Sequence, residues 1–220
     1  MEKPKVIFLD AVGTLFGVQG SVGAAYADIA QRFGVEADPE PLNQAFFKAF
    51  KGAEAMAFPD ADPTDVPAQE YAWWRAIAEQ SFQTVGLIDQ FEDFDAFFAD
   101  LYAYFAGADP WFVYPDAYHS LERWKSMGIE LGVISNFDSR LYTVLDALAL
   151  SDFFQSITIS TEVGAAKPDP LVFATALQKH GCQATDAWHV GDSFSDDYEG
   201  AQTAGLRGIW LRRPTELLTP

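Results

Sequence analysis

The 220-residue chain has little cysteine, few basic residues and no long apolar run. Its single cysteine, Cys182, has no partner for an internal disulfide, which fits a reducing compartment. Lysine and arginine together number 14 against 32 aspartates and glutamates, so the formal net charge is -18. A chain with this charge repels phosphate backbones and anionic membrane surfaces. We therefore expect neither a nucleic-acid partner nor a membrane partner.

The apolar runs are too short for a membrane span, which needs roughly 20 residues. The first of them covers only Val6–Leu9 and ends at Asp10, so it is also too short for the core of a signal peptide. With 49% hydrophobic and 15% aromatic residues, the composition is that of a folded globular protein and not of a disordered one. These observations predict a soluble, cytoplasmic protein.

Short β-rich runs alternate with helical segments at both ends of the chain. The runs are Val6–Leu9, Ile129–Ile134, Ile157–Ser160, Ala187–Val190 and Gly208–Leu211. Helical patterns lie between the later runs, at 116–127, 139–149, 170–180 and 198–204. Strands that alternate with helices of this length are typical of a parallel sheet with helices on both faces. The sequence therefore predicts an α/β fold with a doubly wound parallel sheet.

The middle of the chain shows helical periodicity and no convincing strand. The expected helices are 23–33, 41–50, 68–85 and 91–105. We predict that residues 18–109 form an inserted helical domain, and that residues 1–17 and 110–220 together form the α/β core. An insertion attached at two points beside the first strand suits a lid that closes over a substrate.

Polar side chains follow the predicted strands. The candidates are Asp10 and Thr14 after the first run, Ser135 and Asn136 after the second, Lys167 before the helix at 170–180, and Asp192 and Asp197 after the fourth run. In open α/β sheets, ligands bind at the carboxyl ends of the strands. We therefore expect these side chains to lie close together at one edge of the sheet.

In this order, and with a helical insertion after the first, the four motifs resemble the signatures of the haloacid dehalogenase (HAD) superfamily. The insertion resembles the cap of its subfamily I. The segments Asp10–Phe16 and Tyr71–Arg75 are similar to the REG-2-like branch of subfamily IA. The resemblance covers the whole chain. It implies a Rossmann-like α/β core with a helical cap, a hydrolase that uses Mg²⁺, and a small-molecule substrate.

The resemblance also implies roles for individual residues. Asp10 would be the nucleophile that forms an aspartyl-phosphate, and Ser135 and Lys167 would hold the phosphoryl group. Oxygen ligands suit Mg²⁺; the implied set is Asp10, the backbone carbonyl of Val12, Asp192 and Asp197. The predicted substrate-binding residues are Thr14, Asn136 and Arg75. Arg75 follows Trp73 and Trp74 on an expected cap helix, where one tryptophan is expected in the cap and the other at the seam with the core.

One position departs from the family pattern. HAD phosphatases usually carry a second aspartate two residues after the nucleophile, and here Val12 stands in its place. That aspartate protonates the leaving alcohol and later activates water, which valine cannot do. The main expectation is a phosphatase for a small phosphorylated metabolite that lacks this general acid. Whether the protein is a monomer or a homodimer stays open.

Three alternatives stay open beside it. A 2-haloacid dehalogenase needs no acid, because halide leaves unprotonated. Such enzymes, however, carry a cap arginine soon after the first motif, and this chain has none between Arg32 and Arg75. They also have a tyrosine where Phe173 stands. A phosphonate hydrolase would need a Schiff-base lysine, for which Lys48 and Lys51 are the only cap candidates. The third alternative is a catalytically weakened HAD protein that binds a ligand.

Overall fold

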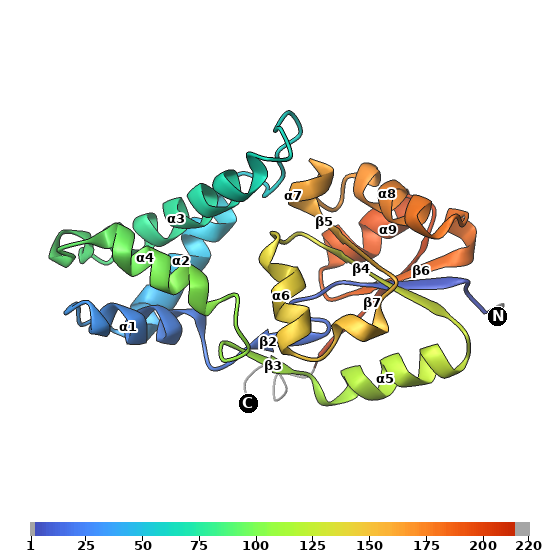
Figure 1. Cartoon of the computed structure of the whole chain (residues 1–220), viewed down its shortest axis with the longest axis horizontal. Coiled ribbons are helices and arrows are strands. Elements are labelled where there is room, and N and C mark those ends of the chain that lie inside the picture. The colour runs from blue at the N-terminus through green and yellow to red at the C-terminus, as the bar shows by residue number, and fades with distance from the viewer. Residues whose placement is uncertain (1–2, 214–220) are drawn as a thin grey trace.

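The computed structural model of the chain describes residues 3–213. At its centre is a five-stranded, all-parallel sheet in the order β5-β4-β1-β6-β7 (Figure 1). The strands are β1 (Val6–Leu9), β4 (Glu130–Ser135), β5 (Ser156–Ile159), β6 (Ala187–Gly191) and β7 (Arg207–Trp210). Each lies within one residue of a predicted run. The structure therefore confirms the predicted α/β class and its doubly wound parallel sheet.

Helices cover both faces of this sheet. On one face, Ile7 and Leu9 of β1 pack in a core with residues of α5 (Pro115–Ser126) and α6 (Arg140–Ala147). On the other face, Val6 and Phe8 pack against α8 (Pro170–His180) and α9 (Gly200–Thr203). Burial on both faces explains why the strands are continuous apolar runs and show no polar alternation.

The direction of chain winding reverses at β1. β1 pairs with β4 on one side and with β6 on the other, and the chain then continues outward to β5 and β7. The carboxyl end of β1 is therefore the topological switch point, which is where open α/β sheets bind ligands. Asp10 follows β1 directly, so this topology places it at the switch point.

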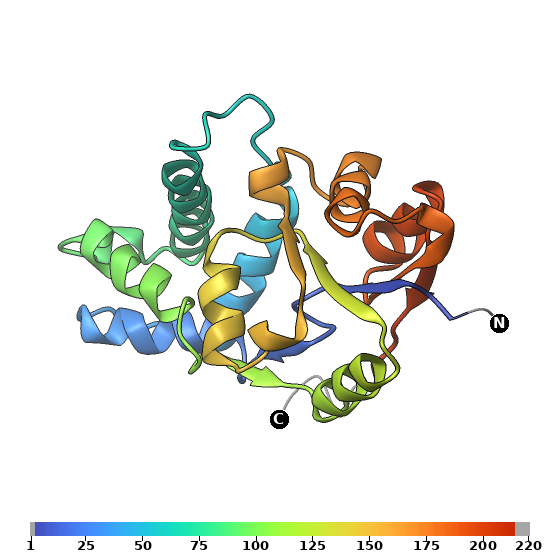
Figure 2. The ribbon, with the colours of Figure 1, turned by 45° about the vertical axis from the view of Figure 1, so that its right-hand side comes forward.

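The cap is a separate group of helices beside the sheet (Figures 1 and 2). It comprises α1 (Val22–Arg32), α2 (Pro39–Gly52), α3 (Val66–Thr84), the short η1 (Ile88–Gln90) and α4 (Phe94–Tyr104). These helices bury an aromatic core of their own, in which Phe82 and Phe97 are fully buried with ring centroids 5.2 Å apart. The cap therefore has an interior distinct from those of the α/β core.

Two short strands connect the cap to the core. β2 (Phe16–Val18) and β3 (Trp111–Val113) form an antiparallel pair, in which Gly17 faces Phe112. The sequence indicated no strand at either position. The predicted domain boundary at 17/18 falls within β2, and the boundary at 109/110 falls just before β3. Residues 1–2 and 214–220 of the predicted core domain lie outside the described residues.

Local sequence signals explain where several helices begin. Ser21 accepts a hydrogen bond from the backbone N–H of Ala24 at the start of α1, and Asp93 does the same for Ala96 in α4. Such side chains satisfy N–H groups that have no partner within the helix. α2, α3, α5 and α8 each carry a proline in the first turn, where its missing N–H costs nothing.

The remaining helical pieces are short: η2 (Ser151–Phe153), α7 (Ser160–Val163) and η3 (Ala184–Asp186). After β6 the chain forms a π-helical segment, η4 (Phe194–Glu199), that runs directly into α9, where the sequence predicted one helix at 198–204. π-helical turns are often found at functional sites. Within residues 3–213, no helix has the length and apolar character needed to cross a membrane.

Candidate active site

A buried lysine joins two carboxylates at the carboxyl edge of the sheet. Lys167 Nζ donates to Asp10 Oδ1 at 2.7 Å and to Asp197 Oδ1 at 2.6 Å. Its third hydrogen bond goes to the carbonyl of Ile134, at 3.0 Å. The three ionisable residues are at least 92% buried. All three ammonium protons therefore have partners, which is the condition under which a buried charge is tolerated.

Burial and neighbouring charges shift the pKa values of this cluster in opposite directions. Burial raises the pKa of Asp10 to about 6, with repulsion from Asp197 and Asp192 adding to the effect and Lys167 opposing it. For Asp197, burial is outweighed by Lys167 and His189, which hold the pKa of its carboxyl well below its usual value. Burial disfavours the charged form of Lys167, but Asp10 and Asp197 outweigh burial and raise its pKa.

Asp197 is fixed by two further donors. The ring Nε2 of His189 lies 2.9 Å from Asp197 Oδ1, and the backbone N–H of Ser193 donates to Oδ2 at 2.9 Å. His189 is fully buried in β6, and burial lowers its pKa. Its other ring nitrogen has no hydrogen-bond partner among the described residues. His189 therefore orients Asp197, a role for which the sequence gave no signal beyond its place in a strand.

Asp192 completes a group of three carboxylates. One oxygen each of Asp10, Asp192 and Asp197 lie within 4.8 Å of one another. Burial, and then the charge of Asp197, raise the pKa of Asp192. Thr14 Oγ1 donates to Asp192 at 3.4 Å. Three converging carboxylates with one lysine between them leave net negative charge, and their oxygens are the ligands that Mg²⁺ prefers. The donor set fits a divalent cation.

Two glycines make room for these carboxylates. A Cβ on Gly13, whose φ is +89°, would lie 2.5 Å from Asp192 Oδ2, and a Cβ on Gly191 would lie 2.1 Å from Asp197 Cγ. Either contact is shorter than real Cβ contacts allow. At both glycines the backbone therefore lies closer to the carboxylates than a residue with a Cβ would allow.

Three other predicted site residues, Ser135, Asn136 and Val12, differ in what they contact. Ser135, 3% exposed, ends β4 beside the cluster. The amide of Asn136 bonds the backbone of Lys167 on both sides, accepting from its N–H at 2.7 Å and donating to its carbonyl at 2.9 Å. Asn136 therefore positions the lysine loop. Val12 is half-buried and forms a bridge with Phe16. Metal binding by its carbonyl stays a prediction.

The structure does not bring Arg75 into this group. Its guanidinium pairs with Glu79 at 2.8 Å and with Asp95 at 2.6 Å, and it covers the ring of Phe94 on the cap. The neighbouring Trp74 faces the core instead, donating from its indole to Asp138 at 2.6 Å. Trp73 donates to a cap carbonyl, that of Glu54. The expected division of the two tryptophans between cap and seam is confirmed.

Arg140, at the start of α6, is an arginine that does lie between the core and the cap. It forms a bidentate pair with Asp138, through Nε at 2.8 Å and Nη2 at 2.7 Å. Its third nitrogen donates to the carbonyl of Tyr102 on the cap, and the guanidinium lies 3.8 Å from the centre of that ring. From the sequence alone, the position of Arg140 five residues after Ser135 indicates only that it could approach substrate or start a helix.

A buried cap carboxylate holds the cap against the core. Glu70 of α3 is fully buried and accepts from Thr161 Oγ1 at 2.6 Å, from the backbone N–H of Ser139 at 3.0 Å and from the Ser139 hydroxyl. Hydrogen bonds to a charged group are among the stronger ones in proteins. Nothing in the sequence distinguishes Glu70 from a solvent-exposed helix residue.

Arg213 supports the turn that carries the nucleophile candidate. Its guanidinium donates to the carbonyls of Gly13, at 3.1 Å, and Thr14, and it pairs with Asp116 at 2.8 Å. It also stacks on Tyr114, 3.6 Å from the ring centre. The sequence carried no signal for this contact, which joins residues about two hundred positions apart.

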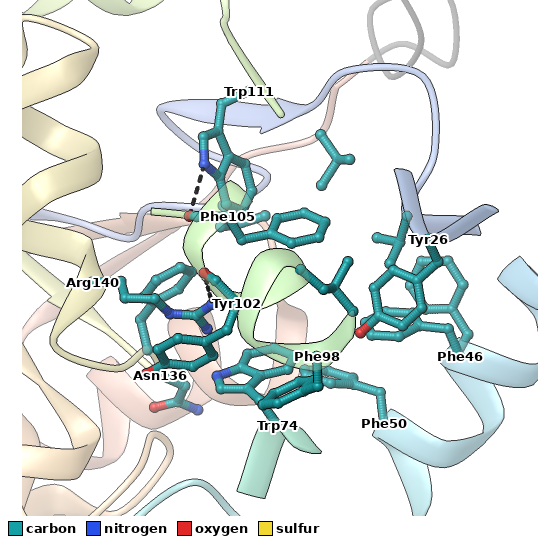
Figure 3. Close-up of a pocket in the computed structure, with 16 residues that line it drawn as sticks. Tyr26, Phe46, Phe50, Trp74, Phe98, Tyr102, Phe105, Trp111, Asn136 and Arg140 are labelled. Carbon is teal, nitrogen blue, oxygen red and sulfur yellow. Dashed lines mark hydrogen bonds between the residues drawn. The ribbon is translucent and has the colours of Figure 1, made fainter. Parts of the chain in front are cut away.

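Between the cap and the core lies a cavity of about 250 Å³, shown in Figure 3. Of the sixteen described residues that line it, ten are aromatic, four are aliphatic, and the other two are Asn136 and Arg140. Val12 is one of the lining residues and connects the cavity to the Asp10 turn. An apolar pocket with a few polar groups, next to residues with shifted pKa values, is a typical ligand site.

A doubly wound core with a carboxylate–lysine centre under a helical cap defines a capped α/β hydrolase architecture. The model of a protein family described as haloacid dehalogenase-like hydrolase matches residues 4–205. The haloacid dehalogenase-like hydrolase domain-containing protein 3 of Danio rerio is 32% identical over 207 residues, which are 94% of this chain and 84% of that protein. The chain therefore belongs to the haloacid dehalogenase-like hydrolase family.

Solved structures support the same fold. A dehalogenase aligns with a TM-score of 0.70 at 21% identity, covering 98% of this chain and 88% of its own. A HAD phosphatase from Thermococcus onnurineus aligns with a TM-score of 0.64 at 22% identity, covering 96% of this chain and 87% of its own. Because both kinds of enzyme share the fold, the likeness leaves the reaction to be argued from the site.

Proposed function

We propose that this protein is a Mg²⁺-dependent phosphatase in which Asp10 forms an aspartyl-phosphate intermediate. The observation that carries the proposal is the group formed by Asp10, Asp192 and Asp197, with one oxygen of each within 4.8 Å. Asp10, Asp192 and Asp197 would hold Mg²⁺, joined by the carbonyl of Val12. The bound cation lowers the repulsion between the nucleophile and an anionic phosphate.

The side chains then divide the work. An Asp10 oxygen forms a bond to phosphorus, and the bond from phosphorus to the leaving oxygen breaks with its electron pair. Lys167, already 2.7 Å from Asp10, offsets charge on the transferred group, and Ser135 donates to it. In the second step water attacks phosphorus and the Asp10 carboxylate leaves, which regenerates the enzyme and releases inorganic phosphate.

Val12 limits which substrates this centre can hydrolyse quickly. A proton donor at the leaving oxygen typically contributes about 10²–10⁴ in rate. Valine has no proton to give, so leaving groups that are stable as anions are favoured. This part of the proposal rests on residue chemistry and on the place of Val12 in the cavity wall.

The test is Mg²⁺-dependent phosphate release from 1-naphthyl phosphate by the wild type and by Asp10→Asn. We expect a loss of at least about 10³ in kcat, because the amide is a far weaker nucleophile. The matched control is Asp89→Asn on the cap surface, which should behave as wild type. Equal rates for wild type and Asp10→Asn, with both folded by circular dichroism, would overturn the proposal.

A second candidate is hydrolysis of 2-haloacids. The apolar Val12 and the apolar cavity favour it, because halide leaves without a proton. The three converging carboxylates argue against it, and so does Arg140, the cavity arginine, whose Nε and Nη2 are held by Asp138. Chloride release from 2-chloropropionate, measured for wild type and Asp10→Asn, decides between the two reactions.

A further inference from the structure

We propose that the substrate is an aryl phosphate, with its ring seated in the cavity under the cap and its phosphate at Asp10. This rests on the proposed phosphatase function and names the chemical class of its substrate. Two independent observations lead to it: the lining of the cavity, and the replacement of the usual proton donor by Val12, which belongs to that lining.

The cavity has the size and the surface for a ring. Cavities of about 150 Å³ lined by apolar side chains bind benzene. At about 250 Å³, this one has room for a substituted ring or a fused pair of rings. Phe50, Trp74 and Phe98 contribute flat aromatic surface from three different cap helices (Figure 3). Aromatic pairs gain about 0.5–1.5 kcal/mol beyond the burial of apolar area.

The leaving group agrees with the missing acid. A phenol has a pKa of about 10, as tyrosine does, whereas an aliphatic alcohol is close to water, at about 16. An aryl oxide therefore departs with the electron pair of the broken P–O bond and takes its proton from water afterwards. A sugar or alkyl alkoxide would need the donor that Val12 does not supply. The apolar wall and the absent acid thus select the same substrate class.

Charge in the cavity argues against a substrate with a second phosphate. Among the described residues that line the cavity, Arg140 is the only cationic one, and Asp138 neutralises it through two hydrogen bonds. Asp138 is fully buried, so the pair is fixed. Nucleotides and sugar bisphosphates would therefore place their further anionic groups against neutral aromatic surface, with no opposite charge to offset the loss of hydration.

Tyr26 places a hydroxyl at the far side of the cavity from Asn136 and Arg140 (Figure 3). Its side chain is 97% buried, and its hydroxyl points into the cavity (Figure 3). Within residues 3–213 the hydroxyl has no hydrogen-bond partner. A hydroxyl that faces an apolar cavity can form a hydrogen bond with a bound ligand, which adds favourable free energy to binding. We infer that the ring carries a hydrogen-bonding substituent that meets Tyr26.

The experiment uses four phosphates that separate ring binding from leaving-group quality, each with Mg²⁺. 1-Naphthyl phosphate has the ring and the good leaving group, and cyclohexyl phosphate has apolar bulk with a poor leaving group. Acetyl phosphate has a good leaving group without a ring, and glycerol phosphate has neither. We expect kcat/KM for 1-naphthyl phosphate to exceed that for acetyl phosphate by at least about tenfold and that for cyclohexyl phosphate by at least about 10².

The outcomes separate the two proposals. If none of the four is hydrolysed, or if Asp10→Asn retains full activity, the proposed phosphatase function fails. If acetyl or glycerol phosphate is hydrolysed as efficiently as 1-naphthyl phosphate, the phosphatase stands and the aryl specificity is wrong. Binding of 1-naphthyl phosphate to Asp10→Asn, followed through tryptophan fluorescence, gives a readout that needs no turnover, since Trp74 and Trp111 line the cavity.

Two variants locate the ring. Phe50 lines the cavity and is 41% exposed, so Phe50→Asp is compatible with folding and places a charge against the ring. We expect at least about tenfold weaker binding of 1-naphthyl phosphate. Met127→Asp, at a 46% exposed apolar residue outside the cavity lining, is the control and should bind as wild type. Equal weakening by both variants, or by neither, would contradict the assignment.

Tyr26→Phe tests the polar contact without changing the shape of the cavity. Wild type and variant are compared on 4-acetylphenyl and 4-isopropylphenyl phosphate, so that differences between the leaving groups cancel. We expect the ratio of kcat/KM for the acetyl compound to that for the isopropyl compound to be about three- to tenfold smaller in the variant than in wild type. An unchanged preference would show that the substituent does not reach Tyr26.

Discussion

The side of the core that faces the cap and the side of the cap that faces the core, called here the core wall and the cap wall, differ in almost every physical property. The core wall carries Asp10, Lys167 and Asp197, all buried and joined by hydrogen bonds of 2.6–2.7 Å. The cap wall is made of aromatic and aliphatic side chains, with Tyr26 offering a hydroxyl. This difference is the basis of our proposal that the core acts on a charged group and the cap binds an uncharged one. Val12 is the residue where the two walls meet.

This difference separates reaction from specificity. Lys167 and Asp197 are each held by three hydrogen bonds, so small displacements of their side chains are costly. The cap surface binds by shape and apolar area, which many sequences can supply. Replacing a core residue should remove the chemistry, and replacing a cap residue should change what is hydrolysed.

The largest expected effect comes from removing the charge at the centre of the core wall. Lys167→Met leaves Asp10 and Asp197 as buried acids without their common partner. We expect loss of detectable turnover and a decrease of about 3–5 kcal/mol in the free energy of unfolding. Urea denaturation measures the second quantity, with Lys48→Met on the exposed surface of α2 as the control. Wild-type stability in Lys167→Met would contradict a buried ionic cluster.

The next largest effect should come from replacing Val12 with a residue whose side chain carries an acidic proton. Val12→Asp supplies a donor beside the leaving oxygen, so kcat/KM for cyclohexyl phosphate should rise by about 10² while kcat/KM for 1-naphthyl phosphate, which reports only the step in which the leaving group departs, changes little. Val12→Asn has nearly the same shape and no acidic proton, and should leave cyclohexyl phosphate poorly hydrolysed. If turnover of cyclohexyl phosphate is the same in Val12→Asp and wild type, another donor serves the site.

A backbone change should weaken metal binding without removing a ligand. Gly13→Ala places a Cβ 2.5 Å from Asp192 Oδ2, so Asp192 must move. We expect Mg²⁺ affinity, measured by calorimetry, to fall by about tenfold or more. Gly34→Ala is the matched control, because Gly34 also has a positive φ, of +78°, but an open space around it. Equal Mg²⁺ affinity in the two variants would separate Asp192 from the metal site.

The smallest expected effect concerns Glu70, whose hydrogen bonds join the cap to the core. Glu70→Gln turns one acceptor of the buried carboxylate into a donor that faces the hydroxyl of either Ser139 or Thr161. We expect a decrease of about 2 kcal/mol in the free energy of unfolding and a raised KM for 1-naphthyl phosphate, with kcat nearly unchanged. Glu36→Gln, on the cap surface, is the control. Thermal unfolding and initial rates measure both quantities.

The core could largely be predicted from sequence because its signals are local. Strands buried on both faces are continuous apolar runs, and the polar residues that follow them occupy one sheet edge by topology alone. The short hinge strands β2 and β3 escaped prediction, since three residues give no periodicity. The partners Glu70 and Arg213 did as well, because only the folded chain brings them to Ser139 and to the Gly13–Thr14 turn.

The sequence does not predict which residues of the cap face the core. Trp73, Trp74 and Arg75 are consecutive on α3, and successive helix residues point about 100° apart. Their sequence cannot say which of the three faces the core. In the structure it is Trp74, while Arg75 pairs with Glu79 and Asp95. The cavity likewise required the fold, because its lining comes from α1, α2, α3 and α4 together with core residues.

The central claim is that Asp10 carries the phosphoryl group during turnover. Wild type is mixed with 1-naphthyl phosphate and Mg²⁺, quenched rapidly in acid and digested, and the peptides are analysed by mass spectrometry. We expect the mass of one phosphoryl group on Asp10, lost on treatment with hydroxylamine and not found in Asp10→Asn. Steady turnover with no phosphoryl group on Asp10, or with the group on another residue, would contradict the account.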